Sequence, residues 1–456
     1  MATTPEEWLP ILTKSLDDRY PRVALLRGYA NGEARLPEMG KNLAESWKAF
    51  QKKARTNLGG LAVGSLGDRL RPNGIRIGSD STSPALAAAR RIWRDNRMDV
   101  QVSDAINDYL EVGTGYLATG ADAGTAVISR EKPEDFYAKP HPLRPWKAVA
   151  AVKVWRTDLG IDLARVWAPG ADQLFQRTTK TASGTVRTGA AGDDWVPVSE
   201  ATPYLGDPPV IILERKNGQG LVEPHLDVID RINLGKLQRL VITALQAFAQ
   251  RALKSTGNAD GTEGGLPTED ADGNSIDYAR TFEPGPGALW ELPEGIDIWE
   301  SQQTDIRPLL DGEKADARDF AAVTRTPISV FIPDGSNQSA EGAANAKEGQ
   351  VFQAKDEIAR LGPGLAVLIV YALRAEGIEL EGETVEILWT PPEHVSLSEK
   401  YAAAAQAKAA GIARKTILRD ILGYSPDQID QDALDLAEEQ LATLSLIGGT
   451  GGDPAA

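Results

Sequence analysis

The sequence contains no cysteine, which excludes disulfides, thiolate metal sites and cysteine nucleophiles together. A reducing compartment is the modest inference from that absence. Histidine is nearly as scarce: three occur, each close to a proline or at the boundary of an expected element, and none has a second candidate ligand beside it. They are His141, His225 and His394. We therefore expect surface histidines rather than a histidine-based metal site or switch.

Catalytic fingerprints are also missing. None of G-x-S-x-G, H-E-x-x-H or G-x-G-x-x-G occurs in a suitable context, so hydrolase, zinc protease and dinucleotide-binding interpretations have no starting point. Asp270, Asp272 and Asn274 resemble a fragment of a calcium loop, but the bidentate glutamate at the twelfth position is absent. A solvated acidic turn is the favoured interpretation. The sequence predicts no catalytic residue, no cofactor and no metal.

Long apolar runs are absent as well. The longest, LAVLIVYAL over Leu365–Leu373, is about half of the roughly 18 residues that a membrane-spanning helix needs. The N-terminal stretch carries acids and lacks the basic, apolar and small-residue order of a signal peptide. We expect neither a membrane span nor secretion.

Positive charge is in deficit, because 49 Lys and Arg stand against 65 Asp and Glu and give a formal net charge of -16. Tight nucleic-acid binding needs Lys and Arg to displace the counterions of the phosphates, so this balance argues against a protein whose main role is to grip DNA. An acidic wall is nevertheless compatible with the passage of a duplex, since strong phosphate pairing would slow its sliding.

What remains is a chain of 456 residues with 42% hydrophobic content, enough for two to four domains of about 100 to 200 residues each. Apolar spacing predicts an amphipathic helix over 42–70, a turn at Asn73 and Gly74, a short strand after it, and a second helical pattern over 83–120. Short β-like runs separated by Gly, Pro and Asp fill Thr125–Ile212. The fold class expected is α+β and mainly helical.

The second half alternates long helices with two unusual segments. His225–Lys254 carries apolar residues at helical spacing over about 45 Å. It runs into a Gly- and Pro-rich excursion, Thr256–Glu300, whose eleven acids and one base give 1 - 11 = -10. Another helix is expected over Asp305–Thr326, ended by Pro327. The small polar loop that follows contains no Gly-Lys-Ser/Thr and therefore does not predict a phosphate-binding loop.

After this loop, Ser339 is placed to cap a helix whose first turn carries Glu341. We expect an interruption at Gly362–Gly364, where Gly-Pro-Gly follows the pattern, and then a resumed helix. Ala-rich helices begin near Ser396, and the chain ends in a Gly-rich tail.

The order of these parts resembles the portal proteins of tailed double-stranded DNA phages, and in particular those of long-tailed phages that infect Gram-positive bacteria. The residues that carry the resemblance are Thr324–Pro327, Asn337–Glu341, Val112–Gly120 and the closing GIARKTILRDILGYSPDQID. It covers nearly the whole chain. One departure is Gly342 and Ala343, where the family usually has Ala and then a larger aliphatic residue.

The resemblance implies a portal fold of wing, stem, clip and crown. The implied parts are the wing (1–217), the first stem helix (218–255), the clip (256–304), the second stem helix (305–326), the tunnel loop (327–338), a wing helix and strand (339–395), the crown (396–446) and a flexible tail (447–456).

By the same resemblance the chain is not an enzyme. It would form a ring of usually about twelve subunits at one capsid vertex of the virion, after assembly in the host cytoplasm. The implied partners are double-stranded DNA passing through the tunnel, the terminase motor, head-tail connector or adaptor proteins, and the major capsid and scaffolding proteins, with no membrane.

Three sets of residues follow from that assignment. The tunnel loop would face moving DNA with small polar residues that can shift without a fixed partner: Asp334, Gly335, Ser336, Asn337 and Gln338. Basic residues of the stem that could face DNA are Lys236, Arg239, Arg251, Lys254, Lys314 and Arg318. Solvated faces or ion pairs between subunits are the competing interpretation for these six. Docking of the motor or connector at the clip is assigned to Asp270, Asp272 and Glu294.

Two other classes stay open on the sequence alone. An intracellular enzyme with a pocket in the α+β region would need a cluster of catalytic side chains, and a helical scaffold that binds another protein would be a monomer. Sedimentation separates them from a ring of many subunits.

Overall fold

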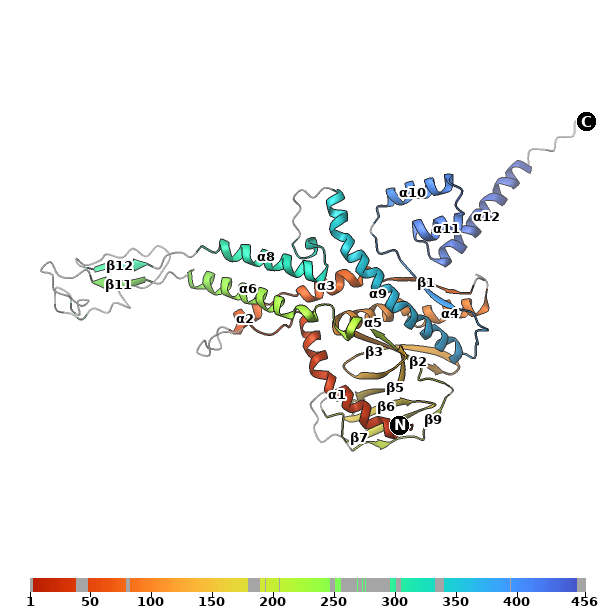
Figure 1. Ribbon diagram of the computed structural model, residues 1–456, viewed down its shortest axis with the longest axis horizontal. Helices are drawn as coiled ribbons and strands as arrows, with labels where there is room; N and C mark the ends of the chain where they lie inside the picture. Colours follow the sequence, from red (N-terminus) through yellow and green to blue (C-terminus); the bar gives the residue numbers. More distant parts are fainter. Residues whose placement is uncertain are drawn as a thin grey trace, which may run out of the picture. The chain divides into compact units, whose positions relative to one another are not determined.

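A computed structural model of the chain is shown in Figure 1. It describes residues 3–37, 48–78, 83–178, 189–192, 194–204, 206–246, 251–255, 269, 273, 275, 296–300, 305–332, 340–393 and 395–448. The chain divides into two compact units: unit 1 is Met1–Arg35, Thr56–Ile229 and Ala317–Ala456, and unit 2 is Leu36–Arg55 and Asp230–Asp316.

Unit 1 is built on an antiparallel sheet with the strand order β3-β2-β10-β5-β6-β7-β8, in which β4 also pairs with β5 and β9 with β7. The strands are β2 (Thr114–Asp122), β3 (Thr125–Glu131), β4 (Phe136–His141), β5 (Arg144–Arg156), β6 (Ile161–Ala168), β7 (Ala171–Thr178), β8 (Val196–Pro197), β9 (Thr202–Pro203) and β10 (Val210–Glu214). The β-rich texture predicted for Thr125–Ile212 is confirmed.

Both faces of this sheet are covered. Helix α1 (Pro5–Ala30) begins with a capping box formed by Thr4 and Glu7 and has Pro5 in its first turn. One buried cluster joins α1 to strands β5 and β6: Trp8, Leu12, Leu16, Val152 and Val166. The opposite face buries another cluster: Tyr116, Phe136 and Trp167. Each such side chain contributes about 1.5 to 3 kcal/mol on burial, so these two layers hold the centre of unit 1.

Two of the helical patterns in the first 120 residues are divided where a single helix was expected. The pattern over 42–70 forms α2 (Lys48–Ala54) and α3 (Leu58–Gly67), because the Asn57 side chain accepts a hydrogen bond from the Gly60 N–H and caps α3. Residues 38–47 lie outside the described residues.

The pattern over 83–120 forms α4 (Pro84–Asp95), α5 (Met98–Val112) and then β2. Arg97 has a φ of 51° and ends the first helix, and Gly113 has a φ of 86° and ends the second. A Cβ atom at Gly113 would lie 2.3 Å from the Gly218 carbonyl oxygen, so only glycine fits there.

The predicted strand after Asn73 and Gly74 is confirmed as β1 (Pro72–Ile77), but those two residues belong to the strand rather than to a turn. β1 pairs in antiparallel register with β13 (Val385–Trp389), with a register shift between Pro72 and Gly74.

Helix α9 (Ala340–Ala375) is continuous through Pro363, so the predicted interruption at Gly362–Gly364 is wrong. A proline inside a helix costs about 3 kcal/mol. Packing against β2 and β10 outweighs that cost, since four apolar side chains that flank the proline are fully buried: Leu361, Leu365, Leu368 and Ile369. A Cβ atom at Gly364 would lie 3.1 Å from the Leu213 side chain, so this glycine lets the helix approach β10 closely.

Lys347–Ala375 within α9 is long and apolar enough, by length and composition only, to cross a membrane. A core helix of a folded domain passes the same test, and α9 packs on the sheet of its own unit.

In unit 2, parts of α6 (Leu226–Gln246) and α8 (Arg307–Thr324) are linked by ion pairs: Arg231 Nε lies 2.9 Å from Asp316 Oδ1, and Arg239 Nε lies 3.0 Å from Glu313 Oε1. The helix predicted over His225–Lys254 is too long. It ends at Gln246, and β11 (Arg251–Ser255) pairs with β12 (Ile296–Glu300), placing Leu253 opposite Ile298. Cross-strand pairing with a distant segment replaces the last helical turns.

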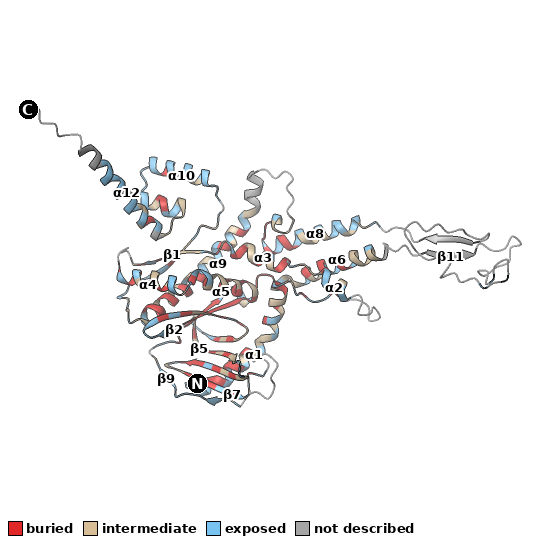
Figure 2. Cartoon of the chain, turned by 180° about the vertical axis from the view of Figure 1, so that it is seen from behind, coloured by how far each residue is buried: buried red, intermediate tan, exposed pale blue. Residues whose placement is uncertain are grey.

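Short 3₁₀ helices among the described residues connect these elements: η2 (Lys216–Gly218), η3 (Glu223–His225) and η4 (Ile328–Val330). The C-terminal helices are α10 (Leu397–Ala409), α11 (Arg414–Thr416), the π-helix η5 (Ile417–Leu422) and α12 (Pro426–Gly448). Ser396 and Glu399 form a capping box at the start of α10. Figure 2 shows that buried residues gather in the sheet, α1, α5 and α9, whereas α10 and α12 are mostly exposed.

Candidate functional site

The segment Thr324–Pro327 forms a tightly bonded end to α8. Thr324 is buried, and its hydroxyl donates to the Phe320 carbonyl at 2.7 Å and lies 3.0 Å from the Thr326 hydroxyl. The Thr326 N–H donates to the Ala321 carbonyl at 2.9 Å, and the Arg325 N–H to the Ala322 carbonyl at 3.2 Å. This is the hydrogen-bond pattern of a Schellman motif, in which a left-handed residue closes the helix.

Arg325 is that left-handed residue, with a φ of 53°. Most helices place glycine there, because a residue with a Cβ atom pays about 1 to 2 kcal/mol in this conformation. The Arg325 side chain is exposed and forms no ion pair within the described part of the chain. Sequence reasoning missed it. The signal was Pro327, which commonly stands one or two residues beyond such a cap.

The segment predicted to form the tunnel loop follows this end of α8. The 3₁₀ helix η4 is fixed to α8 by an edge-on contact of Phe331 with Phe320, whose ring centroids are 5.3 Å apart. Helix α9 begins at Ala340 on the other side. The predicted tunnel-loop residues Asp334, Gly335, Ser336, Asn337 and Gln338 lie outside the described residues, as does Ser339.

A hollow of ≈ 520 Å³ lies where α8, η4 and α9 meet, and Arg318 and Arg325 both line it. The other lining residues are Ala321, Ala322, Thr326, Pro327, Ile328 and Gly349. Both guanidinium groups are exposed and without an ion pair among the described residues. Arginine presents its donors in a fixed fork that suits phosphate oxygens, so this surface can contact a phosphate at the entrance to the loop.

The other basic residues predicted for the stem differ in their exposure and in their ion pairs. Arg239 is taken up by its ion pair with Glu313, and Lys236 is partly buried, so burial lowers the pKa of its ammonium group. Lys314 is exposed. Arg251 and Lys254 lie on β11 rather than on a helix, and their side chains lie outside the described residues. Of the six, Arg318 is the one that lines the hollow at the end of α8.

The predicted clip residues Asp270, Asp272 and Glu294 lie outside the described residues. Beside them, Glu269 and Ser275 form an isolated antiparallel bridge. Within the described ranges, no group of three or more His, Asp or Glu side chains is placed to hold a metal ion.

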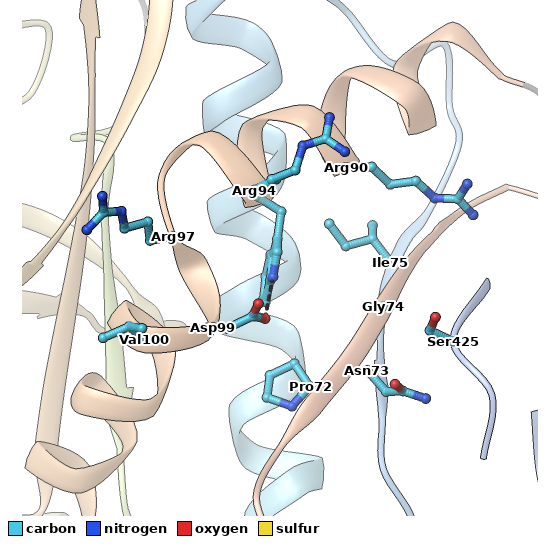
Figure 3. Close-up of a pocket in the computed structure, with 11 residues that line it drawn as sticks. Pro72, Asn73, Gly74, Ile75, Arg90, Arg94, Arg97, Asp99, Val100 and Ser425 are labelled. Atoms are coloured by element: carbon cyan, nitrogen blue, oxygen red, sulfur yellow. Dashed lines mark hydrogen bonds between the residues drawn. The ribbon is translucent and has the colours of Figure 1, made fainter. Parts of the chain in front are cut away.

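A second basic surface lies on α4, shown in Figure 3. Arg90, Arg94 and Arg97 line a hollow of ≈ 510 Å³, but their guanidinium groups point in different directions. The Trp93 indole N–H donates to Asp99 at 2.8 Å and fixes the start of α5 to α4. Diverging cations do not form a cradle for one small anion, so we assign no ligand to this hollow.

A third hollow, of ≈ 610 Å³, is the place where an enzyme of the α+β region would hold its substrate. Its walls include Trp167, Tyr204 and Tyr371, and burial raises the pKa of Tyr371 to about 12, away from the range useful for acid or base catalysis. Two of its three acids form ion pairs: Asp172 lies 2.6 Å from Arg165 and Asp207 lies 2.7 Å from Lys147. The third, Glu379, is exposed on the wall.

Comparison with known proteins gives a family and a set of similar folds. The family profile described as "Phage portal protein, SPP1 Gp6-like" matches residues 11–443. A search among curated proteins finds no match. One similar solved structure is described as "Virion of native gene transfer agent (GTA) particle", with 16% identity, a TM-score of 0.46, and coverage of 88% of this chain and 98% of the other. Another is "Neck of native GTA particle computed with C12 symmetry", with 15% identity, a TM-score of 0.44, and coverage of 88% and 99%.

Proposed function

Because the chain belongs to the SPP1 Gp6-like family of phage portal proteins, we propose that its subunits form a ring at one capsid vertex through which double-stranded DNA is packaged and ejected. The family match, which extends over residues 11–443, carries the proposal. Portal proteins of this family are structural, so the chain is not an enzyme. The proposal includes a place for the assembled ring in the virion, after assembly in the host cytoplasm.

The geometry at the end of α8 supports a passage for DNA. The end of α8 is fixed by the Thr324 hydroxyl and the Phe320–Phe331 contact, and the predicted tunnel loop follows it in the sequence. Arg318 and Arg325 are exposed cations at this end of α8. Two cations per subunit on an otherwise acidic protein provide contacts that are weak enough for DNA to slide.

The first test is the assembly state of the purified full chain. End-on rings in electron micrographs, with a sedimentation mass of many times 48.9 kDa, are expected. A monomer or dimer over a wide concentration range would overturn the proposal and favour the helical scaffold. The proposal also assigns the protein to a long-tailed phage of a Gram-positive host. Electron microscopy of the particle that carries the protein tests the tail length, and the bacterium that the particle infects tests the host.

The acidic segment 256–304 is proposed to dock the terminase motor and then the connector. Its net charge of -10 over 256–300 suits recognition by a basic partner, since charge acts mainly on encounter rate and partner choice. Neutralising Asp270, Asp272 and Glu294 to the amides should weaken attachment of terminase while rings stay intact. Attachment that is unchanged over a range of salt concentrations would refute this assignment.

A further inference from the structure

The C-terminal helices carry two exposed apolar stripes that nothing within the described chain covers. On α12, Leu434 is 61% exposed and Leu441 is 67% exposed. They are seven residues apart, so they lie on one face about 10.5 Å from each other. On α10, Leu397 is 70% exposed and Tyr401 is 54% exposed, and these two are also one turn apart on one face. Figure 2 shows both helices largely in the colour of exposed residues.

The first turns of α12 are anchored within their own chain. The start of α12 is held through Ile429, which is buried, and through ion pairs of Asp430 with Arg90 at 3.4 Å and of Asp432 with Arg414 at 2.7 Å. From residue 437 to residue 443 every side chain is exposed. A helix end of this kind gains little stability by itself, because helices in water depend on packing of an apolar face.

The charges of the two segments are opposite. Residues 426–448 contain six acids and no base, a charge of -6. Residues 395–425 contain five bases and two acids, giving 5 - 2 = +3. Beside the stripes, Asp435 and Glu438 on α12 and Lys408 on α10 are exposed and form no salt bridge within the described ranges. The two stripes therefore share their apolar character and carry charges of opposite sign beside them, with the two leucines of α12 about 10.5 Å apart along the helix and Leu397 and Tyr401 about 6 Å apart on α10.

We propose that α12 of one subunit packs on α10 of the next, with Leu434 and Leu441 against the face that carries Leu397 and Tyr401, and with the acidic segment 426–448 beside the basic segment 395–425. Two different surfaces of the same chain then meet in a head-to-tail contact, which closes into a ring when the rotation between subunits permits. This inference rests on the proposed ring. It adds to it a specific contact that links neighbouring C-terminal helices.

The absence of cysteine makes the contact directly testable. A full-length variant with Tyr401→Cys and Leu441→Cys has one thiol on each stripe and no other thiol in the chain. A second variant combines Leu397→Cys with Leu434→Cys, so that the result does not depend on one register. Assembled rings are oxidised and run on a non-reducing gel, where at least one variant should give a ladder of covalent multimers. Disulfides form only when the Cβ atoms come within about 3.5 to 4.5 Å.

The matched control pairs Leu441→Cys with Leu159→Cys, since Leu159 is 87% exposed on a different part of the chain. It should stay monomeric on the gel. Mixed assembly of chains that carry Tyr401→Cys alone with chains that carry Leu441→Cys alone should give dimers and nothing longer, which distinguishes contacts between subunits from contacts within one.

A charge reversal gives an independent measurement. Lys408→Glu lowers the charge of residues 395–425 from +3 to +1 and should raise the subunit concentration needed for ring formation several-fold. Rings that form normally in micrographs while neither cysteine pair gives a ladder would overturn this contact and leave the portal proposal standing. Failure of the cysteine-free parent to form rings would instead overturn the portal proposal itself.

Discussion

The sheet region and the long helices differ in how far they bury their apolar side chains. In unit 1, the sheet and helices α1, α5 and α9 bury most of their large apolar side chains within one chain, with Ile11, Val100 and Phe352 among the exposed exceptions. Helices α6, α8 and α12 bury fewer and leave several exposed: Leu234, Leu310, Val323, Leu434 and Leu441. We expect the first region to depend mainly on contacts within one subunit and the second to depend more on contacts between subunits.

The largest expected effect is on assembly. Leu240→Asp with Leu245→Asp should abolish ring formation while the subunit stays folded, because helix α6 would then carry two charges on the apolar side expected to pack between subunits. Sedimentation measures ring formation, and circular dichroism checks the fold. Leu143→Asp, at a site that is 83% exposed, is the control and should assemble normally. Normal rings from the double variant would show that α6 is not an intersubunit helix.

Within the sheet region, the charge cluster around Asp108 should carry the largest single cost. Asp108 is fully buried, and its Oδ1 lies 2.7 Å from Arg27 and 2.6 Å from Arg130. Asp108→Ala leaves two arginines without this partner and should lower the free energy of unfolding by about 3 to 5 kcal/mol. Asp435→Ala removes an exposed carboxylate on α12 and should change the free energy of unfolding by less than about 0.5 kcal/mol. Urea unfolding of unassembled subunits measures both, and equal losses would remove the distinction between the regions.

A pair of leucine truncations sharpens the comparison further. Leu368→Ala in α9 removes a fully buried side chain and should cost the subunit about 2 to 5 kcal/mol of unfolding free energy. Leu441→Ala should leave the subunit unchanged within about 0.5 kcal/mol and lower the stability of the ring instead. Urea titrations at concentrations below and above assembly separate the two outcomes. A loss for Leu441→Ala below the assembly concentration would mean that α12 packs within its own chain.

A substitution in the predicted tunnel loop should have the smallest effect on structure, so its effect is measured on DNA packaging. Ser336→Lys should leave assembly intact and slow packaging, because one added cation per subunit is repeated around the ring and makes duplex binding steeply salt-dependent. Packaged DNA per capsid is measured against time, with Ser199→Lys as an equal charge change on the exposed sheet region. Identical time courses for all three proteins would place the loop away from the DNA.

Local signals explain which expectations hold. Pro327 ends α8 within about two residues of the predicted place, and the alternating runs of Thr125–Ile212 form the sheet. The wrong predictions concern residues whose conformation depends on a segment far away in the sequence. Leu253 continues the helical spacing of α6, yet it pairs with Ile298 in a strand. Gly364 predicts an interruption of the helix, yet its lack of a side chain lets α9 pack closely against Leu213.

The candidate site divides in the same way. Arg318 was one of six basic residues singled out near the long helices, and the structure places it with Arg325 in the hollow at the end of α8. Arg325 was missed because a left-handed conformation of a residue other than glycine has little signature in a single sequence. The six basic residues could not be sorted from the sequence, since the ion pair of Arg239 with Glu313 joins two helices 74 residues apart.

The pairing of β1 with β13 has a consequence for synthesis on the ribosome. Pro72 pairs with Trp389, so β1 leaves the ribosome long before the strand that completes it. At translation rates of about 5 to 20 residues per second, the intervening residues take roughly 15 to 60 seconds to be made. The sheet formed by β2 to β10 can fold during that interval, while β1 still lacks its partner strand β13. The nascent chain is therefore most open to wrong pairing with its neighbours on a polysome just before β13 emerges.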